Sequence, residues 1–171
     1  MSSSVIQQLK TQLGMGARAN KYRIILAGLK GVDDIMVDTF AKSTAIPGRS
    51  FSDIEVRNQG RLTTVMGNAQ FDGTWSVTFM DTEDHTLRKA FLSWMEYMDS
   101  VISHTKGPFT HIEYMTTSIL EQLSTIDNSV KATYTFENVY PKSISDSSVS
   151  DDSQDLIEFT VEFNYSSWAV S

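Results

Sequence analysis

Residues 71–102, FDGTWSVTFMDTEDHTLRKAFLSWMEYMDSVI, contain a change from strand-like to helix-like periodicity. Trp75, Val77 and Phe79 alternate with polar or less apolar residues, the period of two that places one face of a strand on a core. An apolar stripe at helical spacing follows. Its members are Leu87, Phe91, Trp94 or Met95, Met98 and Ile102. We therefore predict a strand followed by an amphipathic helix that covers the open face of a β-sheet.

The residues before and at the start of this helix are of types that stabilise a helix N-terminus. Asp81 or Thr82 can cap the N-terminus, because short polar side chains accept hydrogen bonds from free backbone N–H groups. Glu83 and Asp84 are placed in the first turn, where the helix dipole favours negative charge.

The composition indicates a single globular domain. The chain has 171 residues, of which 40% are hydrophobic and 20% charged, and it has no cysteine. Disulfides, thiolate nucleophiles and cysteine-based metal sites are thereby excluded. No apolar run approaches the roughly 20 residues of a membrane-spanning helix, and the start MSSSVIQQLK lacks the features of a secretory signal. We expect a soluble protein without membrane insertion.

Charge is distributed unevenly along the chain. Residues 1–61 contain nine basic and five acidic residues (net +4), whereas residues 62–171 contain five basic and sixteen acidic ones (net −11). Chance clustering on a solvated surface is one interpretation. The other is that opposite charges meet when copies of the chain assemble, or that an acidic surface repels a polyanion.

The remaining elements are expected to be mostly strands. Residues 1–20 read as a flexible N-terminal arm, and the rest, 21–171, as one domain. Strands are predicted at 22–29, 35–46, 130–139 and 156–165, with Tyr140 and Pro141 closing the third of these. Residues 143–153 are predicted to be a solvated loop. Residues 109–128 are ambiguous and could be a strand followed by a short helical piece near 119–123.

Residues 51–67 read as a hairpin with its turn near residues 58–60. It is polar for a core element, because Arg49, Asp53, Glu55, Arg57 and Arg61 all lie in or beside it. A hairpin of this kind is expected to project from the body. Since an isolated hairpin is marginally stable in water, it would be mobile or completed by a neighbouring molecule.

Together these elements predict a mainly β fold of the α+β class. We expect an antiparallel β-sandwich or open barrel flanked by one amphipathic helix. In the last strand, Glu158 and Glu162 fall on the face opposite Phe159 and Phe163, which places the two carboxylates outside the core.

Catalytic chemistry is disfavoured by the sequence. His85, His104 and His111, the last with Glu113 nearby, do not have the spacing of a zinc motif. We find no GxSxG elbow and no glycine-rich phosphate loop. The negative net charge argues against nucleic-acid readout. We predict no enzyme activity, no cofactor and no metal.

The segment TWSVTFMDTEDHTLRKAFLSWMEY resembles the strand-to-helix segment of tail tube proteins from contractile-tailed bacteriophages. The residues that match that family pattern are Trp75, Val77, Thr78, Met80, Asp81, Asp84, His85, Arg88, Phe91 and Trp94. KSTAIPGRSFSDIEV, ENVYPKSIS and EFTVEFNYSSW resemble further segments of the family in the same order along the chain.

The resemblance implies a structural protein of the virion. Tube proteins of this type form hexameric rings that stack into a hollow cylinder inside a sheath, and DNA passes through the lumen without specific binding. Sheath, baseplate and tape-measure proteins are the implied partners, with synthesis in the host cytoplasm. Candidate inter-subunit contacts are then Arg49, Arg57, Asn58 and Arg61, and candidate lumen-facing residues are Glu158 and Glu162.

Two alternatives remain open. The chain could be a baseplate tube initiator, or the tube of a phage-derived or type VI injection system, with the same fold. From a different class, it could be a small β-sandwich binding module with tryptophan or tyrosine side chains as a stacking platform.

Overall fold

A computed structural model of the chain describes residues 6–7, 17–27, 29, 31–58, 60–70, 72–102, 114–147 and 155–171. The described elements, in chain order, are β1 (Tyr22–Leu26), α2 (Asp34–Phe40), β2 (Ala41–Thr44), β3 (Ser50–Asn58), β4 (Arg61–Gln70), β5 (Thr74–Met80), α3 (Thr86–Ile102), β6 (Thr116–Leu123), β7 (Val130–Ile144), β8 (Glu158–Asn164) and β9 (Ser167–Val170). The α+β class predicted from the sequence is confirmed.

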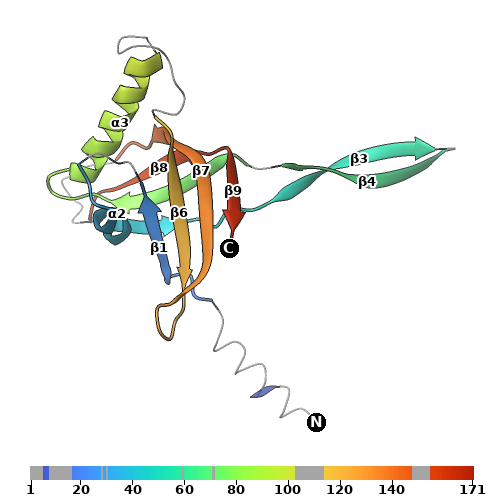
Figure 1. The fold of residues 1–171 in the computed structure, drawn as a ribbon, viewed down its shortest axis with the longest axis horizontal. Coiled ribbons are helices and arrows are strands. Elements are labelled where there is room, and N and C mark those ends of the chain that lie inside the picture. The colour runs from blue at the N-terminus through green and yellow to red at the C-terminus, as the bar shows by residue number, and fades with distance from the viewer. Residues whose placement is uncertain are drawn as a thin grey trace.

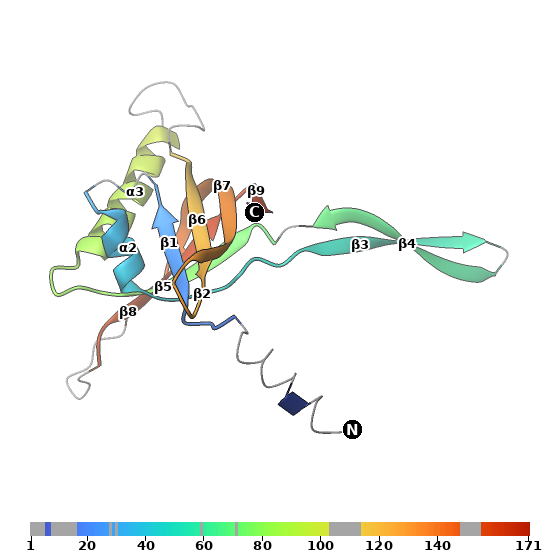
Figure 2. The same ribbon diagram turned by 60° about the horizontal axis from the view of Figure 1, so that its bottom comes forward.

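The body is built on a seven-stranded antiparallel sheet in the order β1-β6-β7-β8-β5-β2, with β9 also paired to β7. The long strand β7 belongs to both halves of this sheet, because its first part pairs with β6 and β9 and its last part with β8. The halves pack face to face: Trp75 of β5 stacks on Phe136 of β7 with ring centroids 4.5 Å apart. The arrangement is that of a sandwich joined through one shared strand (Figures 1 and 2).

The core lies between the inner faces of the strands and the first half of α3. Leu87 and Phe91 of the predicted apolar stripe are fully buried. The Phe91 ring lies 5.3 Å from that of Phe79 and 5.8 Å from that of Phe163. Ile102, at the end of the stripe, is exposed, because α3 continues beyond the sheet (Figure 1). The amphipathic helix is therefore confirmed, with its covering face in the N-terminal half.

The hairpin β3–β4 forms a separate two-stranded sheet and projects from the body, as predicted (Figure 1). It is longer than expected, since the strands cover Ser50–Asn58 and Arg61–Gln70.

The predicted strand at 35–46 is wrong in its first half, where the structure has the helix α2. In a strand, residues 35 and 37 would lie on the same face. Here Val37 is fully buried while Ile35 is exposed, as expected for a helix. The Asp38 carboxylate accepts a hydrogen bond from the backbone N–H of Ile24, so a contact with β1 fixes the short helix in place. The described part of the domain therefore contains two helices, α2 and α3, where the sequence predicted one.

The start of α3 also differs from the prediction. The helix begins at Thr86, and Glu83 and Asp84 lie in the preceding turn instead of the first helical turn. Thr82 still serves the helix start, because its hydroxyl accepts a hydrogen bond from Thr86 N–H at 3.2 Å.

Three further expectations near the C-terminus are corrected. Residues 119–123 belong to strand β6 and are not helical. Strand β7 does not close at Tyr140 and Pro141 but continues to Ile144, because a register shift between Pro141 and Ser143 accommodates the missing N–H of proline. A ninth strand, β9, was not predicted.

The predicted flexible arm at 1–20 lies outside the described residues except for 6–7 and 17–20, and most of the predicted loop at 143–153 does too. Within the described part of the chain, no helix is long and apolar enough to cross a membrane.

Candidate assembly surfaces

The hairpin β3–β4 has two chemically different faces. Side chains of directly paired residues share a face, and the pairs Ile54–Val65 and Val56–Thr63 alternate with Glu55–Thr64. Ile54, Val56 and Val65 therefore lie together on what we call the apolar face of the hairpin. All three are exposed, Ile54 by 53% and Val65 by 50%. In the described structure this apolar face has no core against which to pack.

The opposite face carries most of the charge. Asp53, Glu55 and Arg57 follow one another at alternate positions of β3 and pair with Met66, Thr64 and Leu62 of β4. These charges are the reason why the sequence predicted a hairpin too polar for a core element. The apolar face was overlooked, although the alternation Ile54, Val56 opposite Val65 is visible in the sequence.

The hairpin strands approach each other closely near the body. β4 has a bulge at Gly67 and Asn68, since Phe51 pairs with Ala69 and Asp53 with Met66. A Cβ atom on Gly67 would lie 2.5 Å from Ser52 Oγ and 2.8 Å from the Ser52 carbonyl oxygen. Glycine is required here because any side chain would force the strands apart.

Three of the four predicted contact residues lie together at the hairpin tip. Asn58 pairs with Arg61, and Arg57 precedes them on the other face. All three are exposed. Gly60 adopts a left-handed φ of 79°, the conformation that the turn needs. The tip therefore presents two guanidinium groups to solvent.

The fourth residue, Arg49, lies apart from the others at the base of the hairpin. Its guanidinium carbon is 5.1 Å from the centroid of the Trp168 ring in β9. The structure thus separates Arg49 from the tip.

The outer face of β8 carries both predicted acidic residues. Glu158 forms an ion pair with Lys42 of β2, and Glu162 accepts a hydrogen bond from Ser143 Oγ at 3.0 Å. Between them, Thr160 Oγ1 lies 3.0 Å from Thr78 Oγ1 of β5. The strand parity predicted from the sequence is confirmed, because Phe159, Val161 and Phe163 are buried on the other face. The surface is rich in hydroxyls and less acidic than the sequence suggested, since Lys42 compensates one carboxylate.

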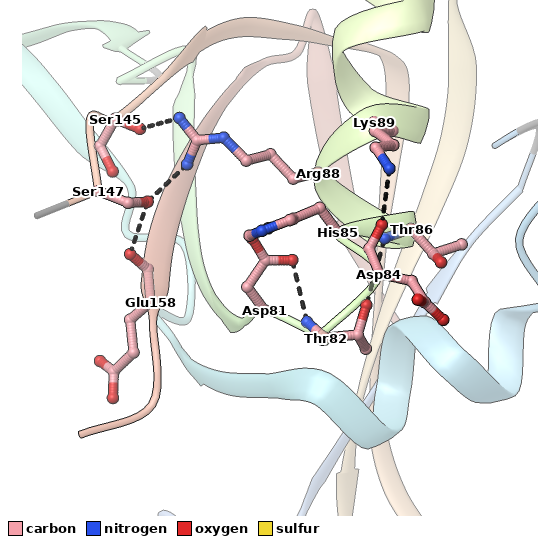
Figure 3. A network of polar contacts seen from close by, with 10 residues as sticks. All are labelled: Asp81, Thr82, Asp84, His85, Thr86, Arg88, Lys89, Ser145, Ser147 and Glu158. Carbon is pink, nitrogen blue, oxygen red and sulfur yellow. Dashed lines mark hydrogen bonds and ion pairs between the residues drawn. The ribbon is translucent and has the colours of Figure 1, made fainter. Parts of the chain in front are cut away.

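A polar network joins the start of α3 to the chain after β7 (Figure 3). Asp81 Oδ2 lies 2.6 Å from His85 Nδ1, and the Asp81 side chain is only 1% exposed. Arg88 donates to Ser147 Oγ and to the Ser145 carbonyl oxygen, and its guanidinium lies 5.6 Å from the Phe159 ring centroid.

These residues have structural partners. Asp81, His85 and Arg88 were among the positions that carried the family resemblance, and each holds the helix start or the strand beside it. His104 and His111 lie outside the described residues. Among the residues that the structure does describe, no group of three His, Asp or Glu side chains is arranged to hold a metal ion.

The tryptophan and tyrosine side chains do not form an exposed stacking platform. All three tryptophans and all six tyrosines fall within the described ranges, and each is buried or half-buried. Trp75 is in the core, and Trp94 Nε1 donates to the Tyr114 carbonyl oxygen at 2.9 Å. The binding-module alternative loses its main support.

Comparison with known proteins identifies relatives of the chain. A family model described as "Phage tail tube protein" matches residues 17–171. No curated protein sequence matches significantly.

Solved structures share the fold at low sequence identity. A chain of the anti-feeding prophage baseplate, solved by cryo-EM, superposes with a TM-score of 0.63 at 11% identity, over 91% of this chain and 95% of that one. A chain of the sheath–tube complex of the extracellular contractile injection system PVC gives a TM-score of 0.61 at 13% identity, over 100% and 98% of the two chains. A chain of the sheath/tube terminator of the same system gives 0.61 at 12% identity, over 91% and 96%.

Proposed function

The chain belongs to the phage tail tube protein family, and on that premise we propose that it is the repeating subunit of the inner tube of a contractile phage tail. Copies would form hexameric rings, and the rings would stack into a hollow cylinder. The role is structural, and no catalytic activity is proposed.

The observation that carries this proposal is the apolar face of the projecting hairpin. Ile54, Val56 and Val65 are about half exposed in the single chain, on a two-stranded ribbon that has no core of its own. Burying such side chains is worth about 1 kcal/mol or more for each of them. A second copy of the chain is the partner that a repeating tube supplies, so we assign the apolar face to the contact between rings.

Charge on the hairpin tip fits the same partner. Arg57 and Arg61 make the tip basic, whereas residues 62–171 carry a net charge of −11. A basic tip and an acidic body attract one another when the tip of one copy reaches the body of the next. We propose that Arg57, Asn58 and Arg61 contribute to this contact. Arg49, at the base, would support the hairpin and not touch the neighbouring ring.

Sheet edges provide the means to close a ring. Strands β1 and β2 end the order of the main sheet, each with one paired neighbour. An edge strand can continue into the sheet of another copy, and a closed ring leaves no edge exposed. We propose that neighbouring subunits within a ring meet along these edges.

The outer face of β8 is the surface that we assign to the lumen. It presents Glu158, Glu162 and the hydroxyls of Thr78 and Thr160, and Lys42 of β2 forms an ion pair with Glu158. A weakly acidic, hydroxyl-rich wall would not retain the DNA phosphates that pass it. Cryo-EM of the tube that places Glu158 and Glu162 away from the lumen would contradict this assignment.

The proposed partners are the tail sheath around the tube and the baseplate and tape-measure proteins at its end and inside it. The particle tail would be its location, after synthesis in the host cytoplasm. A tube initiator in the baseplate, or a tube of a phage-derived injection system, is the same-fold alternative. The similar structures come from both a baseplate and a sheath–tube complex, so fold alone favours neither role.

The experiment that tests the proposal is negative-stain microscopy of the purified chain with and without a change at the tip. The parent chain should give rings and tubes. Arg61→Glu should abolish stacking of rings, and the matched variant Arg61→Lys, which keeps the charge, should retain it. Particles that remain monomeric at high concentration, also when tail baseplates are added as nuclei, would contradict the proposal.

A further inference from the structure

Two segments connect the hairpin to the body, and each accepts a hydrogen bond from a residue of the body. Residues 45–49 lead into β3, and Trp75 Nε1 donates to the Ala45 carbonyl oxygen at 3.2 Å. Residues 72–73 lead from β4 to β5, and Tyr165 N–H donates to the Gly73 carbonyl oxygen at 3.0 Å. The second of these bonds comes from the C-terminal part of the chain.

The C-terminal part also contacts the hairpin base through a side chain. The guanidinium of Arg49, the residue before β3, lies over the ring of Trp168 at 5.1 Å from its centroid. A guanidinium over an indole face is attracted by the negative potential of the ring.

Trp168 itself is held firmly in place. Strand β9 pairs with β7, with Trp168 opposite Phe136, and backbone hydrogen bonds join Ser171 and Thr133 in both directions at 3.0 and 2.9 Å. The Trp168 ring lies 6.0 Å from that of Tyr134. An anchored ring offers a fixed reference for the direction in which Arg49, and with it β3, leaves the body.

Hydrogen bonding by the indole nitrogen does not account for a tryptophan at position 168. Nε1 is buried and has no hydrogen-bond partner in the described part of the chain, which is unfavourable for a polar group. Phenylalanine would fill the position without that penalty. The ring face is the feature that is used, since indole attracts a guanidinium more strongly than phenyl does.

From these contacts we propose that the C-terminal strand β9 fixes the direction in which the hairpin projects from the body. Arg49 is a positioning residue: its stack on Trp168 sets the angle between hairpin and body, and so presents the apolar face and the tip in one direction. The angle is a property of the single chain. Only its consequence for stacking rests on the proposed function.

The direction of the hairpin can be measured in the unassembled chain. Because the sequence contains no cysteine, Thr63→Cys on the hairpin and Ser93→Cys on α3 would carry spin labels at two known, exposed positions. Double electron–electron resonance then gives the distribution of distances between the labels. The labelled parent should give a narrow distribution.

Arg49→Ala and Trp168→Ala should each broaden this distribution. Arg49→Lys should broaden it less than Arg49→Ala does, and Trp168→Phe less than Trp168→Ala does, because each keeps a weaker form of the contact. Arg57→Ala removes the same kind of side chain from the tip of the same hairpin, and it should change nothing in this measurement.

An unchanged distribution in Arg49→Ala overturns the proposal. That variant decides the question if Trp168→Ala does not fold, because removing Arg49 leaves no cavity in the core. A broadened distribution with unimpaired stacking of rings would support the effect on the hairpin direction and show that stacking does not require it. A narrow distribution in a parent chain that forms neither rings nor tubes would instead count against the proposed function alone, so the two failures are distinguishable.

Discussion

The body and the hairpin of this chain differ in how far their apolar side chains are buried. In the body, Phe79, Phe91 and Phe159 are exposed by no more than 1%. On the hairpin, Ile54 and Val65 are exposed by half. The body has all the contacts that a stable domain needs, whereas the hairpin has the backbone pairing of a sheet without anything to cover it. This difference is the one expected if, as we propose, the body folds by itself and the hairpin is completed by assembly.

The largest effect is expected from a change in the core of the body. Phe91→Ala removes a ring that packs on three other phenylalanines, and it should lower the free energy of unfolding by about 3–5 kcal/mol. Urea denaturation of the unassembled chain measures this. Leu92→Ala, one position along and 42% exposed, is the control and should cost less than about 1 kcal/mol. Equal effects would show that α3 does not cover the core as described.

The polar network at the start of α3 should have a smaller effect on the body. Arg88→Ala removes two hydrogen bonds and the contact with the Phe159 ring, so we expect a loss of about 1–2 kcal/mol in the free energy of unfolding. Lys89→Ala, whose partner is the exposed Asp84 carbonyl oxygen, should lose clearly less. A larger loss for Lys89→Ala than for Arg88→Ala would show that the contacts of Arg88 are not the main stabilisation of the helix start.

Changes on the apolar face of the hairpin should leave the body intact. Ile54→Thr combined with Val65→Thr keeps β-branched residues in both strands, and the free energy of unfolding should change by less than about 0.5 kcal/mol. Stacking of rings, seen by electron microscopy, should be lost. Met66→Thr makes a similar change on the other face and should stack normally. If the double variant still forms tubes, the apolar face is not the contact.

A still smaller effect concerns the turn between β6 and β7. Hydrogen bonds from Ser124 and Ser129 hold the pKa of Asp127 at about 2, below its ordinary value of 3.8. The folded state therefore favours the charged carboxylate. The resulting stabilisation is present above pH 3.8 and is lost as the pH falls through about 2.

NMR titration of the Asp127 carboxyl group should show its midpoint near 2, and Ser129→Ala should move the midpoint toward 3.8. A midpoint near 3.8 in the parent would mean that the turn is not ordered in solution.

Periodicity predicted the elements in which local pattern and tertiary structure agree. The strand at 74–80, the helix after it and the face of β8 that carries Glu158 and Glu162 followed from alternation or helical spacing alone. The hairpin was predicted from its turn and from its excess of polar residues.

Elements fixed by distant contacts were not predictable in this way. Helix α2 has a strand-like sequence, and its place depends on the contact between Asp38 and Ile24 in β1. Strand β7 continues past Pro141 because β8 pairs beyond the bulge. The separation of Arg49 from the hairpin tip depends on Trp168, 119 positions later in the chain, and no local signal indicates it.

Hydrogen–deuterium exchange, compared between the unassembled chain and the assembled tube, tests most directly the claim that the hairpin is completed by a second copy. Backbone amides of β5, β7 and β8 should be protected in both states. Those of β3 and β4 should exchange rapidly in the single chain and become protected in the tube. Hairpin amides that exchange equally fast in both states would contradict the account.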